Sequence, residues 1–97
     1  MDKRKAILEI VDLALLINGF SDRSKELTGN LPTVFLEYSG HVSLLMVRIH
    51  SKGWEEDTLP DIVFELYVDK KYSQEELEKC RRKLIEIRGF MRGKEYV

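Results

Sequence analysis

Residues 33–50 read TVFLEYSGHVSLLMVRIH, a run rich in β-branched and aromatic side chains with a glycine near its middle. Such residues favour strands, in which successive side chains point to opposite faces of a sheet. The run predicts one strand over 33–38 and a second over 42–50. The short Ser39-Gly40-His41 connection between them predicts an antiparallel hairpin.

A third strand is predicted over 61–68, where DIVFELYV follows a longer connection that contains Gly53, Trp54 and Pro60. Consecutive strands of this kind pair with one another, so we expect a three-stranded antiparallel meander.

An amphipathic helix is predicted over 3–18, where apolar side chains recur at the spacing of one helix face and Gly19 is placed to end the helix. The face consists of Ile7, Ile10, Val11, Ala14 and Ile17. Four leucines fall off this face, so we expect the second half of the helix to be covered on more than one side. They are Leu8, Leu13, Leu15 and Leu16.

A second helix is predicted after Ser73 and Glu76, which have the spacing of a capping box, and Gly89 or Gly93 is expected to end it. Its apolar stripe consists of Leu77, Cys80, Leu84, Ile87 and Met91. The sequence therefore predicts a single α+β domain over 1–97 in α-β-β-β-α order, with two helices packed on a three-stranded antiparallel sheet.

The composition is that of a folded domain, because the 97 residues are 43% hydrophobic and 34% charged. A net charge of -1 predicts no general attraction to nucleic acid or to an anionic membrane. The apolar run 13–17 is too short to cross a bilayer. Cys80 is the only cysteine, which excludes an intramolecular disulfide and fits a reducing, cytoplasmic compartment. We expect its thiol to be buried and inert.

Charge is unevenly distributed along the chain. Residues 53–69 contain six acids and no Lys or Arg, a net charge of -6, whereas residues 70–97 contain nine bases against five acids, a net charge of +4. Either the two blocks lie close together and partly neutralise each other, which we favour, or each faces a different partner.

His41 and His50 are the only histidines, and their spacing places neither in a Cys-His, His-His or Ser-His-acid set. We expect His41 in a turn and His50 at an exposed strand end. The acids at 55–57 with Asp61 lack the spacing of an EF-hand and predict a solvated loop. We therefore predict no enzymatic activity, no metal site and no cofactor.

One basic patch is a candidate site for an anion. It consists of Lys70, Lys71, Arg81, Arg82 and Lys83. Consecutive helix residues point about 100° apart, so we expect the helical bases to fan around the solvent side. Nearby glutamates at three- or four-residue spacing are expected to pair with them.

The predicted order of elements, with His41 in the first hairpin, is similar to that of the double-stranded RNA-binding domain, which has a histidine in that loop. The resemblance implies that lysines at the start of the second helix would bind the phosphates of the RNA. The chain has Ser73-Gln74-Glu75-Glu76 there, and Lys70 and Lys71 just before it are the only partial substitute. A nucleic-acid binder that uses the basic second helix is therefore the alternative function.

Residues 32–42, PTVFLEYSGHV, together with Gly53-Trp54, also resemble small proteins encoded by phages and prophages of Gram-positive bacteria. This resemblance implies a compact, non-enzymatic accessory module that acts on a host protein.

The middle strand predicts a contact surface, because alternation makes both of its faces apolar. Leu45, Val47 and Ile49 share one face, and Val42, Leu44 and Met46 share the other. Two helices on one side would leave the second face in water, and soluble monomers rarely expose such a patch. We predict a homodimer packed through this face, with a heterologous protein as the alternative partner. The predicted interface consists of Val42, Leu44, Met46, Leu36 and Tyr38, with Phe35 as the alternative contribution of the first strand and part of the third strand beside them.

Overall fold

The computed structural model describes residues 2–20 and 31–95, with side chains as far as Met91. The elements are α1 (Lys3–Asn18), β1 (Thr33–Ser39), a 3-10 turn η1 (Gly40–Val42), β2 (Leu44–His50), β3 (Ile62–Tyr67) and α3 (Ser73–Glu95). The strands form one antiparallel sheet in the order β1-β2-β3. The predicted α+β fold with two helices and a three-stranded sheet is confirmed.

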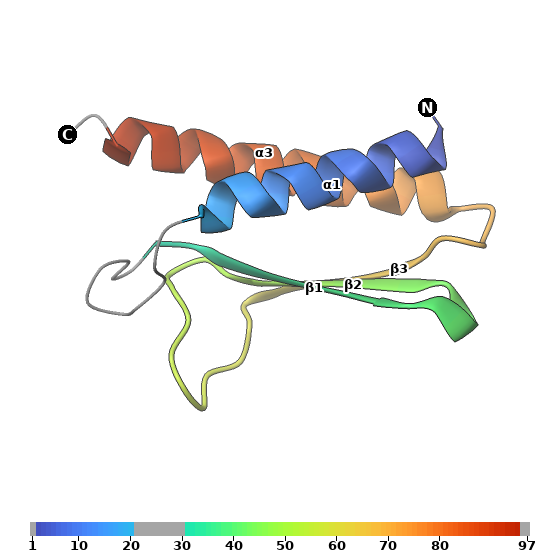
Figure 1. Cartoon of the computed structure of the whole chain (residues 1–97), viewed down its shortest axis with the longest axis horizontal. Helices are drawn as coiled ribbons and strands as arrows, with labels where there is room; N and C mark the ends of the chain where they lie inside the picture. Colours follow the sequence, from blue (N-terminus) through green and yellow to red (C-terminus); the bar gives the residue numbers. More distant parts are fainter. Residues whose placement is uncertain (1, 21–30, 96–97) are drawn as a thin grey trace.

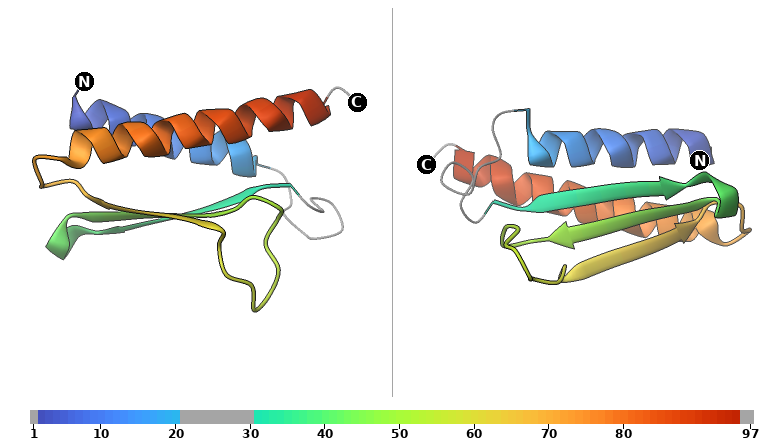
Figure 2. Two further views of the ribbon diagram at one scale, coloured as in Figure 1. Left: turned by 180° about the vertical axis from the view of Figure 1, so that it is seen from behind. Right: turned by 60° about the horizontal axis from the view of Figure 1, so that its bottom comes forward.

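Both helices lie on one face of the sheet and run side by side in the same direction (Figures 1 and 2). Their starts are tied together by Lys3, whose Nζ donates to the carbonyls of Val68 and Lys70 at 2.9 Å each, in the turn that leads into α3. About two turns further along, Arg81 of α3 donates from Nε to the carboxylate of Glu9 on α1. The described elements therefore form two layers, with both described helices on one side of the sheet.

The ends of α1 follow local rules. Asp2 caps the first turn, because its side chain accepts the Arg4 amide at 3.1 Å. Gly19 ends the helix at φ 74, a conformation that other residues rarely adopt, and its amide donates to Leu15. The buried face is rotated slightly from the predicted one, because Ala6 is buried while Ile7 is only partly buried.

The core lies between the two layers. The strand residues that face the helices include Val34, Leu45, Val47, Ile49 and Leu66. The helices contribute Ala6, Ile10, Ala14, Ile17, Leu77, Cys80, Leu84, Ile87 and Met91. All of these residues form one cluster, and the predicted stripe of the second helix is buried along its whole length.

The helix α3 begins where the sequence predicts it but ends later than predicted. Ser73 is the first residue of α3; it is buried, and its Oγ donates to the Val68 carbonyl at 3.4 Å in the preceding turn. The helix also continues past Gly89 and Gly93 to Glu95, so neither glycine ends it. Packing of Ile87 and Met91 on the core supplies the stabilisation that the glycines lack.

The second strand of the hairpin begins later than predicted. Residues 40–42 form a 3-10 turn, Ser43 follows in the left-handed conformation with φ 52, and β2 starts at Leu44. Val42 therefore lies in the turn rather than in the strand.

Three of the four off-face leucines of α1 remain in solvent. Leu8 is 56% exposed, Leu15 45% and Leu16 41%, while Leu13 packs against the core. The expected cover over the second half of α1 is thus only partial among the described elements. In the described part of the chain, neither helix combines the length and apolar composition that a membrane span requires.

Candidate interaction surface

The sheet face opposite the helices carries alternate residues of all three strands. The register aligns them in three rows, which are Phe35, Arg48 and Val63, then Glu37, Met46 and Glu65, then Ser39, Leu44 and Tyr67. We call these residues the outer face. Neither described helix covers it, since both lie on the other side of the sheet (Figure 1).

Apolar side chains are exposed on the outer face. Val63 is 48% exposed, Phe35 38% and Tyr67 37%, and Leu44 and Met46 between them are half-buried. A solvated face of an antiparallel sheet is ordinarily polar. The outer face departs from this pattern, which marks it as a candidate contact surface.

The charged groups of the outer face are few. Arg48 on the middle strand pairs with Glu37 at 3.3 Å, and both side chains are well exposed. Glu65 lies across Met46 from Glu37 and gives the outer face an excess of one negative charge. The face is therefore apolar with an acidic side along β3.

The connection over 51–61 projects from the same side of the sheet as the outer face (Figures 1 and 2). Its base is closed by Asp61, which accepts the Ser51 amide at 2.8 Å and the Ser51 hydroxyl at 2.6 Å. Partial burial raises the pKa of Asp61, but the two hydrogen bonds from Ser51 favour the ionised form and bring the net pKa below its ordinary value. An ionised carboxylate thus anchors the loop.

The loop presents large apolar groups among acids. Trp54 is 50% exposed and Leu59 89%. Glu55, Glu56 and Asp57 are exposed beside them. The loop therefore extends the apolar and acidic character of the outer face to one end of the sheet.

His50 is buried, contrary to the prediction of an exposed strand end. It is 6% exposed, and its ring meets Phe35 in an edge contact with centroids 5.5 Å apart. The prediction was wrong because the 51–61 loop, which shares a hollow with His50, projects on this side of the sheet. His41 lies in η1 and is exposed, as a turn residue should be.

The structure separates the predicted interface residues. Leu44 and Met46 lie on the outer face, and Val42 is 45% exposed at the turn beside them. Leu36 and Tyr38 pair with Val47 and Leu45, so they lie on the helix side of the sheet. Grouping them with Leu44 and Met46 was wrong, because the hairpin register sets the face of each β1 residue.

The residues that replace them on the outer face are Phe35, Val63 and Tyr67. Their alternation within each strand was visible in the sequence, but only the register shows which set accompanies Met46.

The predicted anion-binding residues do not form a common site. Arg81 lies between Glu9 and Glu78, with its Nη1 2.9 Å from Glu78. Arg82 approaches the same Glu78 at 3.3 Å. Of the remaining bases, Lys83 pairs with Glu86 at 3.4 Å and Lys70 with Asp69 at 3.9 Å, while Lys71 is exposed in the turn before α3. These pairs weaken the patch as a site for phosphate.

The loop part of the acidic block and the helical part of the basic block lie on different sides of the sheet. The loop acids at 55–57 project beyond the outer face, whereas α3 packs on the opposite face. Arg81, Arg82 and Lys83 pair with Glu9, Glu78 and Glu86, and Lys79 pairs with Glu76; these acids lie outside the acidic block. One observed pair, Asp69 with Lys70 at 3.9 Å, joins the two blocks.

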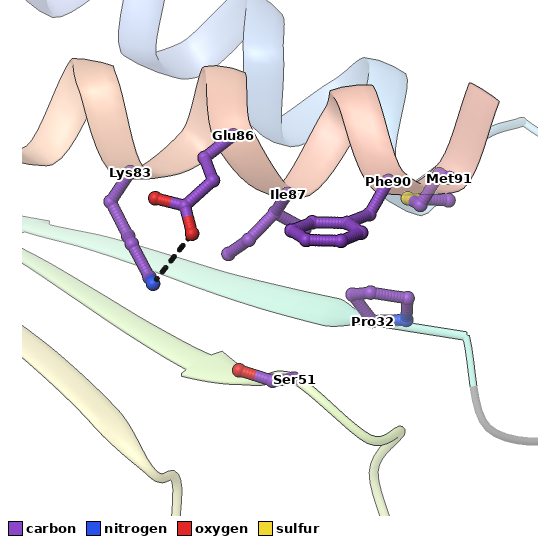
Figure 3. A pocket seen from close by; sticks show the side chains of 7 residues that line it. All are labelled: Pro32, Ser51, Lys83, Glu86, Ile87, Phe90 and Met91. Carbon is purple, nitrogen blue, oxygen red and sulfur yellow. Dashed lines mark hydrogen bonds and ion pairs between the residues drawn. The ribbon is translucent and has the colours of Figure 1, made fainter. Parts of the chain in front are cut away.

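A hollow of about 220 Å³ lies where α3 passes the ends of β1 and β2 (Figure 3). Its lining includes Ile87, Phe90 and Pro32, with Lys83 and Glu86 at one side. Lys83 and Glu86 bond to each other, as the dashed line shows, and the Ser51 hydroxyl bonds to Asp61. Small-molecule sites usually measure about 300–1,000 Å³ and hold convergent polar groups, so this hollow is a weaker candidate than the outer face.

Cys80 is fully buried, as predicted, and burial raises the pKa of its thiol to about 12. Across residues 2–20 and 31–91, no three His, Cys, Asp or Glu side chains come together as ligands for a metal ion.

No protein-family model, no curated protein and no solved structure matches this chain. The functional proposal below therefore depends on the surface alone.

Proposed function

We propose that this chain is a small, non-enzymatic protein-binding or self-associating accessory module, and that the outer face is its contact surface. One observation carries the proposal: both described helices cover the same side of the sheet, while Phe35, Val63 and Tyr67 stay exposed on the other. Burying such side chains against a partner is favourable because it removes apolar surface from water.

A second copy of the chain is the first partner to test, because Met46 lies at the centre of the outer face with Leu44 beside it on the same strand, and a flexible methionine adapts to an apolar contact. The size of the face limits the affinity. Three strands about 4.8 Å apart and about 23 Å long span only about 300 Å², well below the roughly 800 Å² per partner of a stable interface. The dimer therefore dissociates on dilution unless Trp54 and Leu59 of the loop take part.

The experiment is light scattering coupled to a sizing column, over at least a hundredfold range of protein concentration. The wild type should show concentration-dependent dimers, and Leu44→Asp and Met46→Lys should be monomeric throughout. Met46 lies between Glu37 and Glu65 across the strands, so a lysine there gains opposite charges and should not unfold the monomer.

The matched control is Ile85→Asp, which places the same kind of charge on an exposed apolar position of the helix layer. It should dimerise like the wild type. A wild type that is monomeric at every concentration excludes self-association, and dimers that survive both sheet variants place the interface elsewhere. Trp54→Ala should weaken the dimer if the loop contributes to it.

A further inference from the structure

The two edges of the sheet differ in what covers them. At the start of β1 the side chain of Asn18 takes the place of a neighbouring strand: its Nδ2 donates to the Val34 carbonyl at 2.9 Å, and its Oδ1 accepts the Val34 amide at 2.8 Å. A strand that paired with Val34 at this edge would have to displace Asn18. In Figure 2 the other edge, formed by β3, has no described element beside it in the plane of the sheet.

The register shows which groups of β3 face that open edge. Val68 donates its amide to Ser43 at 2.9 Å, so this pair is of the hydrogen-bonded type. Hydrogen-bonded pairs recur at every second residue of an antiparallel ladder. Ile62, Phe64 and Leu66 therefore bond to β2, and the residues between them direct their main-chain groups outward.

Five outward-facing main-chain groups of β3 lack a partner in the described part of the chain. They are the N–H and C=O of Val63, the N–H and C=O of Glu65, and the N–H of Tyr67. The Tyr67 carbonyl already accepts the Lys70 amide at 3.1 Å, which closes that end of the edge. A row of this kind is a template for an added strand.

We propose that the β3 edge binds an extended segment of another protein as a fourth strand, and that this segment carries a lysine or arginine flanked by apolar residues. The side chains of an added strand that lie beside the outer face meet Val63, Glu65 and Tyr67 in turn. Val63 and Tyr67 are 48% and 37% exposed and favour apolar neighbours, whereas the exposed carboxylate of Glu65 favours a base.

Charge excludes a second copy of β3 as the preferred occupant. In the antiparallel register that pairs all three outward-facing positions, Val63 lies opposite Tyr67 and Glu65 lies opposite its own counterpart. Directly opposed like charges destabilise a strand pair. The surrounding segment 53–69 holds six acids and no Lys or Arg, so the edge as a whole repels itself and attracts a basic strand.

This proposal rests on the protein-binding part of the proposed function. It uses the β3 edge and not the outer face, so it is tested by a separate measurement. The probe is the synthetic peptide acetyl-TVTKTVT-amide, titrated into the isotope-labelled full chain and followed by amide hydrogen exchange. We expect the amides of Val63, Glu65 and Tyr67 to gain protection on binding. The peptide acetyl-TVTETVT-amide should bind at least about fivefold more weakly.

N-methylation gives a matched test of strand addition. Methyl groups on the main-chain nitrogens of the peptide's lysine and valines block the amides that face β3, so they should abolish binding. Methyl groups on the main-chain nitrogens of its threonines lie on the side away from β3, so they should leave binding unchanged. The variant Glu65→Lys should reverse the preference between the lysine and glutamate peptides. A thermal melt of that variant shows whether the fold is kept.

Three results would overturn the inference. They are equal binding of both charged peptides, equal binding of the two methylated peptides, and, in the Leu44→Asp variant that should not dimerise through the outer face, protection of Val63, Glu65 and Tyr67 that rises with protein concentration when no peptide is present. The last result would place a second copy on the edge. A wild type that is monomeric in light scattering removes the proposed dimer and leaves the peptide result unaffected.

Discussion

Replacing Asn18 with aspartate should destabilise the fold at neutral pH and much less in acid. The side-chain amide of Asn18 joins the end of α1 to the start of β1 through the two hydrogen bonds to Val34. Asn18→Asp keeps an acceptor for the Val34 amide but removes the donor. It also brings a negative oxygen close to the Val34 carbonyl, where the asparagine nitrogen lies at 2.9 Å.

The magnitude follows from the two bonds and their burial. Each hydrogen bond contributes about 0.5–1.5 kcal/mol net, so Asn18→Ala should cost about 1–3 kcal/mol. Val34 is only 4% exposed, which limits rescue of its main-chain groups by water and favours the upper part of that range. Asn18→Asp should cost at least as much at pH 7, because it loses one bond and adds a repulsion.

Lowering the pH should restore much of the stability that Asn18→Asp loses at neutral pH. The Val34 carbonyl disfavours the ionised carboxylate, so its pKa is raised in the folded state and the protonated form, which can donate to that carbonyl, is the stable one. The loss of unfolding free energy in Asn18→Asp, relative to wild type at the same pH, should therefore be largest above the pKa of the introduced carboxyl group in the folded state. It should shrink as the pH falls through that pKa.

The assay is urea unfolding followed by circular dichroism at pH 7 and near pH 3. Asp12→Asn, a swap of the opposite sense at an exposed position of α1, is the control and should change stability by less than about 0.5 kcal/mol. A penalty below about 0.5 kcal/mol for Asn18→Ala, or a penalty for Asn18→Asp that does not depend on pH, would refute the reasoning.

Three other outcomes are expected. Leu84→Ala should lower the unfolding free energy by about 2–5 kcal/mol in urea titrations, because Leu84 is fully buried between the layers, and a loss under about 1 kcal/mol would contradict that placement. The lowered pKa of Asp61 means that its stabilisation is complete above the ordinary carboxyl pKa and is lost as pH falls through the folded value. The stability difference between wild type and Asp61→Asn should accordingly shrink below about pH 4, and a constant difference would show that Ser51 does not anchor the ionised form. Cys80 should resist a thiol reagent in the native protein at pH 8 and react in urea, and equal rates would contradict its burial.

Local patterns were sufficient to predict the elements and their order. The three- and four-residue spacing from Leu77 to Met91 identified the buried stripe of α3, and Gly19 marked the end of α1. Both signals act within one or two helical turns, so neighbours in sequence carry them. The alternation in β2 showed equally that one of its two apolar faces would lie away from the core.

The composition of the contact surface needed the tertiary structure. Leu36 and Phe35 are adjacent apolar residues, and only the pairing of Leu36 with Val47 assigns one to the helix side and the other to the outer face. A shift of one residue in that pairing would exchange them, because strand side chains alternate. The burial of His50 likewise depends on the side of the sheet from which the 51–61 loop projects.

By itself the sequence determined the α-β-β-β-α order, the buried helix stripes and the presence of apolar residues on both faces of β2, because these depend on short-range periodicity. Only the tertiary structure decided that α3 runs through Gly89, that Arg81 bonds to Glu9, and that the β3 edge stays open while Asn18 occupies the start of β1. Each of these depends on contacts between residues from distant parts of the chain, and a local sequence pattern does not predict such contacts.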